Sequence, residues 1–318
     1  MHRTITRTAA ATLLAFTFMT LVSMDARGEV TAKKTDKGLA IEIDGKPFTT
    51  YTSFGNDKTA TTPICWPIIG PTGKEMTRKY PMVEGDETEK SDHPWHRSLW
   101  FTHGEVNGKS FWDKDPIVEK SRKVEQLGDK VVVTTENDWL NTETNKPECT
   151  DKRTLTFGTI GDVRYIDLDV TITATEGDVL FGDTKEGSMG VRVPGTMKVD
   201  AKKGGHIVNQ QGDTDGETWG KRSPWVDYYG PVEDETLGIA ILNHPKSFRF
   251  PTWWHVRTYG LFAANPFGVS YFEGTGDGKL ELKKGESINL SYRIIFHEGD
   301  TEKAGIDDLY KAYSEEKK

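Results

Sequence analysis

The chain has 318 residues, with 49 aspartates and glutamates against 41 lysines and arginines, and its formal net charge at pH 7 is −8. Nucleic-acid phosphates are bound by clustered Lys and Arg, so this acidic balance, with basic residues scattered along the chain, argues against a nucleic-acid partner. The mean hydropathy is −0.60, and no segment after the first 28 residues approaches the roughly 18 apolar residues of a membrane span, which argues against membrane insertion.

The N-terminus predicts a signal peptide, residues 1–28. Arg3 and Arg7 precede an apolar stretch, residues 9–22, that is too short to span a bilayer. The small residue Gly28 predicts cleavage directly after it. We therefore expect an exported protein, periplasmic or secreted, whose formal charge falls to −10 when three arginines and one aspartate leave with the leader.

Residues 29–318 contain no linker, repeat or low-complexity run, so we expect them to form a single domain. The chain has two cysteines, Cys65 and Cys149. An exporting pathway permits a disulfide, but two cysteines in so long a chain are not a disulfide framework. A bridge and a pair of buried thiols both remain open.

Alternation of apolar and polar residues predicts strands along most of this domain. Segments with strand character are residues 39–44, 130–137, 153–157, 164–175, 189–193, 236–242, 268–274 and 287–300. The alternation is longest in RYIDLDVTITAT (164–175) and SINLSYRIIFHEGD (287–300). Only residues 301–316 have the apolar spacing of a helix. The pattern predicts an all-β fold, a large antiparallel β-sandwich with a short C-terminal helix.

A sandwich of this size is expected to bend one sheet into a concave groove. Polar-face residues of the long strands would line the groove, and we expect Arg293 and His297 among them. A hydrophobic core cannot accept such side chains unpaired.

The stretch SDHPWHRSLWFTHGEVNGKSFWD (91–113) contains three histidines, three tryptophans and one arginine, a mixture typical of a small-molecule site. His93 and His96 form an H-x-x-H pair, but Pro94 disfavours the helix on which such a pair binds zinc. A metal site, turn-capping histidines and an acid/base or ligand-binding role are three interpretations. We favour the third, because imidazole titrates near neutral pH.

Three later segments also concentrate polar and aromatic candidates. Those candidates are Glu186 and Arg192; Trp225 and Tyr228; and Trp254, His255, Arg257 and Asn265. Glu186 is interpreted either as a carboxylate at the groove rim or as an ordinary surface residue. Adjacent side chains of a strand point to opposite faces, so we expect one of Trp253 and Trp254 to face the groove. The aromatic residues have core packing as their alternative.

Several motifs carry a resemblance to a known family. DHPWHRSLWF, VNGKSFWD, DTKEG, WHVRTYGLFAANPFG and YRIIFHEGD together resemble exported bacterial proteins labelled methane-oxygenase-like (PmoA-like), over nearly the whole mature chain. Trp95 stands where that family usually has a histidine. The resemblance implies no established reaction, and the hydropathy excludes a membrane methane monooxygenase subunit. LKKGESINLSYRIIFHEGD also resembles the last strands of the galactose-mutarotase-like supersandwich of aldose epimerases and several polysaccharide lyases.

Together these features predict a carbohydrate-active enzyme that acts by acid/base proton transfer, as in epimerisation or β-elimination, on a small carbohydrate or glycan fragment. The expected catalytic residues are His93, His96, His255 and Glu186. The expected substrate-binding residues are Arg97, Arg192, Trp225, Tyr228, Trp254, Arg257 and Asn265. We expect no cofactor and no metal. A non-catalytic glycan-binding module is the alternative, and a metal-dependent oxidoreductase built on the histidines is a third hypothesis.

Overall fold

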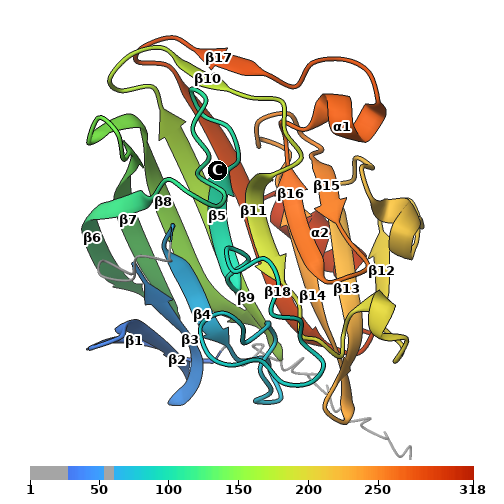
Figure 1. Cartoon of the computed structure of the whole chain (residues 1–318). Coiled ribbons are helices and arrows are strands. Elements are labelled where there is room, and N and C mark those ends of the chain that lie inside the picture. Colours follow the sequence, from blue (N-terminus) through green and yellow to red (C-terminus); the bar gives the residue numbers. More distant parts are fainter. Residues whose placement is uncertain (1–27, 54–60) are drawn as a thin grey trace, which may run out of the picture.

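The computed structural model describes residues 28–53 and 61–318, so the predicted signal peptide lies outside the described residues except for Gly28. Two eight-stranded antiparallel sheets form the body of the protein (Figure 1). The first sheet has the strand order β1 (Val30–Thr35), β2 (Gly38–Ile43), β3 (Lys46–Thr52), β4 (Ile64–Ile68), β5 (Leu99–His103), β11 (Gly187–Arg192), β16 (Leu261–Asn265) and β15 (Trp253–Val256). The second has the order β12 (His206–Asn209), β13 (Trp225–Val232), β14 (Glu235–Asn243), β18 (Ser287–Glu298), β9 (Val163–Thr173), β8 (Lys146–Ile160), β7 (Lys130–Asn141) and β6 (Ile117–Leu127).

Smaller elements flank the two sheets. β10 (Val179–Phe181) pairs with β17 (Leu280–Leu282), and the helical segments are α1 (Val269–Glu273), α2 (Ile306–Ser314) and the 3-10 turns η1 (Val199–Ala201) and η2 (Asp215–Thr218). The predicted large antiparallel β-sandwich with a short C-terminal helix is confirmed. No helix within the described residues is long and apolar enough to cross a membrane.

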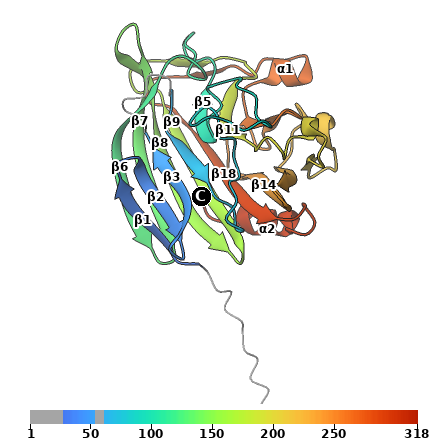
Figure 2. The same ribbon diagram turned by 60° about the horizontal axis from the view of Figure 1, so that its bottom comes forward.

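The core lies between the two sheets, where their apolar faces meet. In β9 and β18 the predicted alternation holds, because Ile166 and Ile294 are opposite one another in the register and both belong to the main buried cluster. Figure 2 shows β1, β2 and β3 lying beside the second sheet at its β6–β9 side. The two cysteines, Cys65 in β4 and Cys149 in β8, are buried free thiols, and burial raises the pKa of the Cys65 thiol to about 12.

The outer face of the second sheet is covered where α2 packs on it (Figure 2). Arg293 is buried there, donating to Asp167 Oδ1 and Oδ2 at 2.6 and 2.8 Å, and its guanidinium lies 4.6 Å from the ring centre of Tyr313 in α2. The prediction that Arg293 and His297 line a groove is therefore wrong. Both side chains find charged partners under or beside α2, which removes the penalty for burying them.

His297 and Asp227 form a second buried pair, between β18 and β13. The Nε2 atom of His297 lies 3.0 Å from Asp227 Oδ1, and the hydroxyl of Thr301 donates to Asp227 Oδ2 at 2.6 Å. Burial opposes the charged imidazolium, but the charge of Asp227 and the hydrogen bond with it outweigh burial and raise the pKa of His297 above its usual value.

Residues 268–274, predicted as a strand, instead form the short helix α1. The carboxylate of Asp183 accepts hydrogen bonds from the backbone N–H of Ser270 in the first turn, and Gly274 ends the helix with a φ of 71°. An N-terminal carboxylate and a left-handed C-terminal glycine stabilise a helical turn. The apolar run alone could not distinguish the two structures.

We expect His297→Gln to lower the free energy of unfolding by about 3–5 kcal/mol at pH 6, because it leaves the buried Asp227 without a cation. A histidine with a raised folded-state pKa stabilises fully below its unfolded pKa of about 6.5, and this contribution is lost as pH rises through the folded pKa. The difference in free energy of unfolding between wild type and variant should therefore become smaller from pH 6 to pH 9, as measured by urea titrations. A difference that stays constant over this range would show that the pair is not ionic.

Candidate functional site

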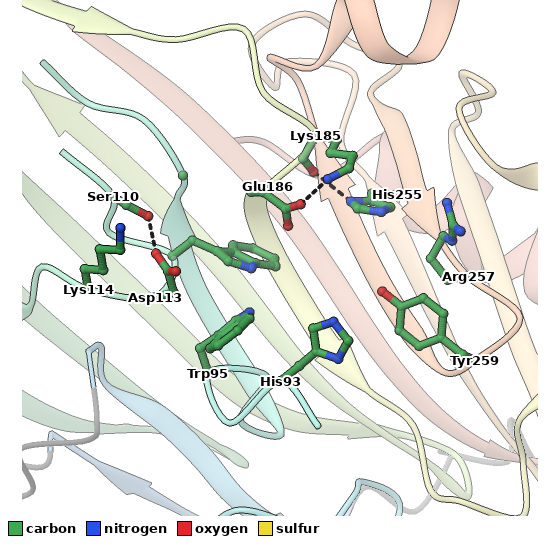
Figure 3. A pocket seen from close by; sticks show the side chains of 12 residues that line it. His93, Trp95, Ser110, Asp113, Lys114, Lys185, Glu186, His255, Arg257 and Tyr259 are labelled. Carbon is green, nitrogen blue, oxygen red and sulfur yellow. Dashed lines mark hydrogen bonds and ion pairs between the residues drawn. The ribbon is translucent and has the colours of Figure 1, made fainter. Parts of the chain in front are cut away.

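A pocket opens on the outer face of the first sheet, away from the core between the sheets, and we call it the outer-face pocket. Its volume is about 420 Å³. It is lined by His93, Trp95, Gly104, Ser110, Trp112, Asp113, Lys114, Lys185, Glu186, His255, Arg257 and Tyr259. The side chains labelled in Figure 3 come from residues 93–95, 110–114, 185–186 and 255–259, and Gly104 completes the lining.

Alternation in β15 places His255 in this pocket. Trp254 and Val256 belong to the main core cluster, so Trp253 and His255 point to the opposite, outer face. The outer face also carries its own small cluster, in which Trp100 and Trp112 pack together. Gly190 in β11 permits this, because a Cβ there would lie 2.5 Å from the Trp100 ring.

A column of four rings runs from the outer-face pocket into the protein. His93 stacks on Tyr259 at 5.8 Å between ring centres and on His96 at 4.8 Å, and His96 stacks on Trp100 at 5.3 Å. His93 has a left-handed backbone, with a φ of 46°. Such a conformation is uncommon for a residue other than glycine.

Two arginines and one carboxylate lie behind the column. Asp92 Oδ1 accepts from Arg78 at 2.9 Å and from Arg192 at 3.3 Å, and the Nδ1 atom of His93 lies 3.2 Å from the same oxygen. Arg192 also lies 3.3 Å from Nδ1 of His96. A guanidinium can only donate, so His96 accepts at Nδ1. Burial, and then the charge of Arg192, lower the pKa of His96 well below its usual value, so His96 is neutral.

His255 presents a defined tautomer to the outer-face pocket. Its Nδ1 lies 2.7 Å from the backbone carbonyl oxygen of Lys185, and because a carbonyl can only accept, Nδ1 carries the proton. Nε2 therefore keeps its lone pair. Burial lowers the pKa of His255 to about 4, while the nearby charge of Glu186 favours protonation, so the ring is neutral at pH 7.

Glu186 lies beside His255 on the pocket wall and is partly exposed. The Lys185 ammonium contacts its carboxylate, as the dashed line in Figure 3 marks. Asn265 in β16 holds this segment in place, because its side-chain amide donates to the carbonyl oxygen of Thr184 at 2.8 Å. Asn265 is thus a positioning residue and is itself fully buried.

Four of the predicted residues line the outer-face pocket, namely His93, His255, Glu186 and Arg257. His96 and Arg192 lie directly behind it, at 1% and 3% exposure. The prediction that His96 acts on substrate is corrected, because His93 separates its ring from Tyr259 in the ring column.

The predicted aromatic contacts also need correction, because Trp225, Tyr228 and Trp254 are interior residues. Trp254 is wholly buried and donates its indole N–H to the Ser223 carbonyl at 2.9 Å. Trp225 donates to Asp307 Oδ1 of α2 at 3.0 Å, and the hydroxyl of Tyr228 donates to the carbonyl of Thr258 at 3.1 Å. Core packing, the alternative interpretation, applies to all three. Arg97 is buried and donates to the Pro94 carbonyl at 3.2 Å, outside the pocket lining.

The prediction missed Trp95, Trp112, Asp113, Lys114 and Tyr259 as pocket residues. The first four lie in or next to the aromatic stretch 91–113, so their segment was identified but not their orientation. Tyr259 lies in the turn that follows β15, where strand alternation does not apply, so the sequence offered no periodic signal for it.

The H-x-x-H pair does not form a shared metal site in this geometry. The rings of His93 and His96 lie face to face, at an interplanar angle of 4°, whereas ring nitrogens bind a metal in the plane of the ring. His103 is separately buried with Nε2 at 3.0 Å from the Gly182 carbonyl oxygen. Across residues 28–53 and 61–318, no three His, Cys, Asp or Glu side chains are grouped to hold a metal ion.

Comparison with known proteins gives a family match. A family model described as "Family of unknown function (DUF6807)" matches residues 38–311. No curated protein matches the chain. The match does not bear on the methane-oxygenase-like label, which stays a prediction.

Several solved structures resemble the fold at low identity. A GH36 α-galactosidase from Geobacillus stearothermophilus is 10% identical with a TM-score of 0.42, over 87% of this chain and 42% of that one. A heparan sulfate lyase mutant from Pedobacter heparinus is 10% identical with a TM-score of 0.38, over 87% and 36%. A galactose mutarotase-like protein from Clostridium acetobutylicum is 9% identical with a TM-score of 0.38, over 86% and 99%. This chain spans less than half of the first two, and at such TM-scores none carries an argument.

We expect Trp254→Ala and Trp95→Ala to separate a core indole from a pocket indole. Trp254→Ala should lower the free energy of unfolding by about 3–5 kcal/mol, because it leaves a cavity in the core. Trp95→Ala, at a partly exposed site, should lower it by about 1–2 kcal/mol. Urea unfolding of both variants measures the difference. Equal losses would contradict the placement of the two rings.

Proposed function

The chain belongs to the DUF6807 family, a family of unknown function, and we propose that it is a carbohydrate-active enzyme that transfers a proton on a sugar bound in the outer-face pocket. The observation that most supports this is His255, a neutral imidazole with a fixed tautomer and an available Nε2 lone pair in a ring-lined pocket. Such a nitrogen can accept a proton from a bound ligand.

The lining suits a sugar better than an apolar ligand. Trp95, Trp112 and Tyr259 provide flat rings on which the C–H face of a sugar can pack. Asp113, Lys114 and other polar groups also line the pocket and can hydrogen-bond to hydroxyls. Mixed stacking and hydrogen bonding of this kind supports a polar ring as the ligand.

In the proposed reaction His255 takes a proton at Nε2. The carboxylate of Glu186, which is close enough to raise the pKa of His255, stabilises the imidazolium that forms. His93 lies across the pocket from Glu186 and Lys185 in Figure 3. Groups on opposite sides of a sugar can remove a proton from one face and return one to the other, as epimerisation requires. β-Elimination uses the same base.

We also propose that the protein is exported. The basic, apolar and small-residue succession of residues 1–28 supports export, so the sugar would be met in the periplasm or outside the cell.

His255→Gln should slow proton exchange at a sugar carbon by about 10²- to 10⁴-fold, because it removes the accepting nitrogen. The measurement is proton NMR in D₂O with a panel of hexoses and hexuronates, which reports proton abstraction even without net conversion. Glu186→Gln should also slow exchange.

The matched control for this test is His206→Gln, at an exposed histidine outside the outer-face pocket, which should exchange at the wild-type rate. A sugar that binds wild type without any exchange would favour the glycan-binding module. Failure of the whole panel to bind would contradict a carbohydrate function.

The exchange rate should also depend on pH in a defined direction. Burial lowers the pKa of His255 to about 4, so the accepting form persists through neutral pH and is lost as pH falls through about 4. We expect a rate that is level near pH 7 and declines below pH 5, with circular dichroism verifying the fold at each pH. A decline centred near pH 6.5 would assign the base to an ordinary exposed histidine.

A further inference from the structure

Arg257 is a pocket arginine whose guanidinium makes no hydrogen bond or ion pair with the described part of the chain. Its guanidinium carbon lies 5.6 Å from the ring centre of Trp219 and 5.7 Å from that of Tyr259, and its charge also lowers the pKa of His255. A guanidinium carries several N–H donors in a planar fork, and partly buried arginines normally use them. The donors of Arg257 are therefore available to a ligand.

Three other cations near the outer-face pocket already have carboxylate partners, whereas Lys114, on the Asp113 side of the lining, has no carboxylate partner among the described residues. Lys185 contacts Glu186, and Arg78 and Arg192 share Asp92. The chain as a whole carries a net charge of −8, so carboxylates are plentiful. An unpaired guanidinium on the pocket wall is therefore able to bind negative charge supplied by a ligand.

The surroundings of Arg257 favour an anion. Arg192 lies 4.8 Å from the ring centre of Tyr259, on a ring that also contacts Arg257, so two guanidinium groups flank one tyrosine. The carboxylate of Asp113 lies on the opposite side of the pocket in Figure 3, where it contacts Ser110. The end of the pocket formed by Arg257 and Tyr259 therefore has an excess of positive charge.

We propose that the substrate is an anionic sugar of the hexuronate class, and that Arg257 binds its carboxylate. This inference rests on the proposed function and names its substrate. Two parallel N–H donors match the two oxygens of a carboxylate, and the ring contacts hold the guanidinium plane before the ligand arrives. The Tyr259 hydroxyl can donate a further hydrogen bond to the same group.

The position of Arg257 relative to His255 connects this binding to the chemistry. Arg257 directly follows β15, two residues after His255, and both side chains line the outer-face pocket. In a hexuronate the carbon that bears the carboxylate carries an acidic C–H. When that C–H bond breaks, the proton moves to His255 Nε2 and the electron pair moves into the carboxylate, whose added charge Arg257 stabilises. Return of a proton from the other face completes an epimerisation, and no oxidant is needed.

The test compares hexuronates with their parent hexoses, using glucuronate, galacturonate and mannuronate against glucose, galactose and mannose by isothermal titration calorimetry. We expect at least one hexuronate to bind wild type about tenfold to a hundredfold more tightly than its hexose, the range for hydrogen bonds to a charged group. Arg257→Gln should abolish this preference, so that the hexuronate and its parent hexose bind with similar affinity. Arg257→Lys should retain part of it, because the charge remains and the fork is lost.

Arg222→Gln is the matched control, since Arg222 is exposed, lies 4.3 Å from the Trp253 ring centre and is outside the pocket. It should keep the full preference, which separates a local contact from a change in overall charge. Equal binding of hexoses and hexuronates to wild type would overturn this inference and leave the proposed function intact. A preference that survives Arg257→Gln would also overturn it. Failure of both hexoses and hexuronates to bind would overturn this inference and the proposed function together.

Discussion

The half of the first sheet that is formed by β5, β11, β16 and β15 is buried on both faces, and this constraint determines where chemistry can occur. Along β15, Trp254 and Val256 enter the core while Trp253 and His255 point outward. The outward face would be expected to contact water, yet Trp100 and Trp112 cover part of it with a second apolar cluster. The outer-face pocket occupies the part that this cover leaves open. The side chains that face the pocket are therefore shielded from water on the side of the sheet and reached by water on the side of the pocket opening.

Desolvation explains why His96 and His255 are neutral. Burial lowers the pKa of His96 and His255, and the nearby guanidinium groups lower it further. The pKa of Arg78 is lowered for the same reasons: burial, and then the charge of Arg192, lower it to about 10. The site holds fixed positive charge on arginines and keeps its imidazoles as hydrogen-bonding groups. Protonation of His96 or His255 is thus opposed by burial and by the positive charge of a nearby guanidinium.

The sequence predicted the strands well, but it predicted less well the direction in which individual side chains point. Alternation in residues 164–175 and 287–300 identified two central strands because period two leaves a strong pattern. The same rule placed Trp253 and Trp254 on opposite faces but could not tell which face the second sheet would cover. Around His93 the backbone is left-handed, with a φ of 46°, so no period applies and the pocket side chains of that turn could not be assigned. Arg293 was misplaced because its partner Asp167 lies on the neighbouring strand β9, 126 residues away along the chain, and because α2 covers this part of the sheet.

The strand order of the first sheet has a consequence for how the protein folds. β5 pairs with β11, and β11 pairs with β16, so neighbours in space are far apart along the chain. Sheets of high contact order fold slowly, since long loops must close before the pairing stabilises them. The outer-face pocket draws on segments from both ends of this pairing, so it exists only after the last of these strands is in place. Ligand affinity is thus a property of the completely folded chain, and a bound ligand draws the folding equilibrium toward the native state by mass action.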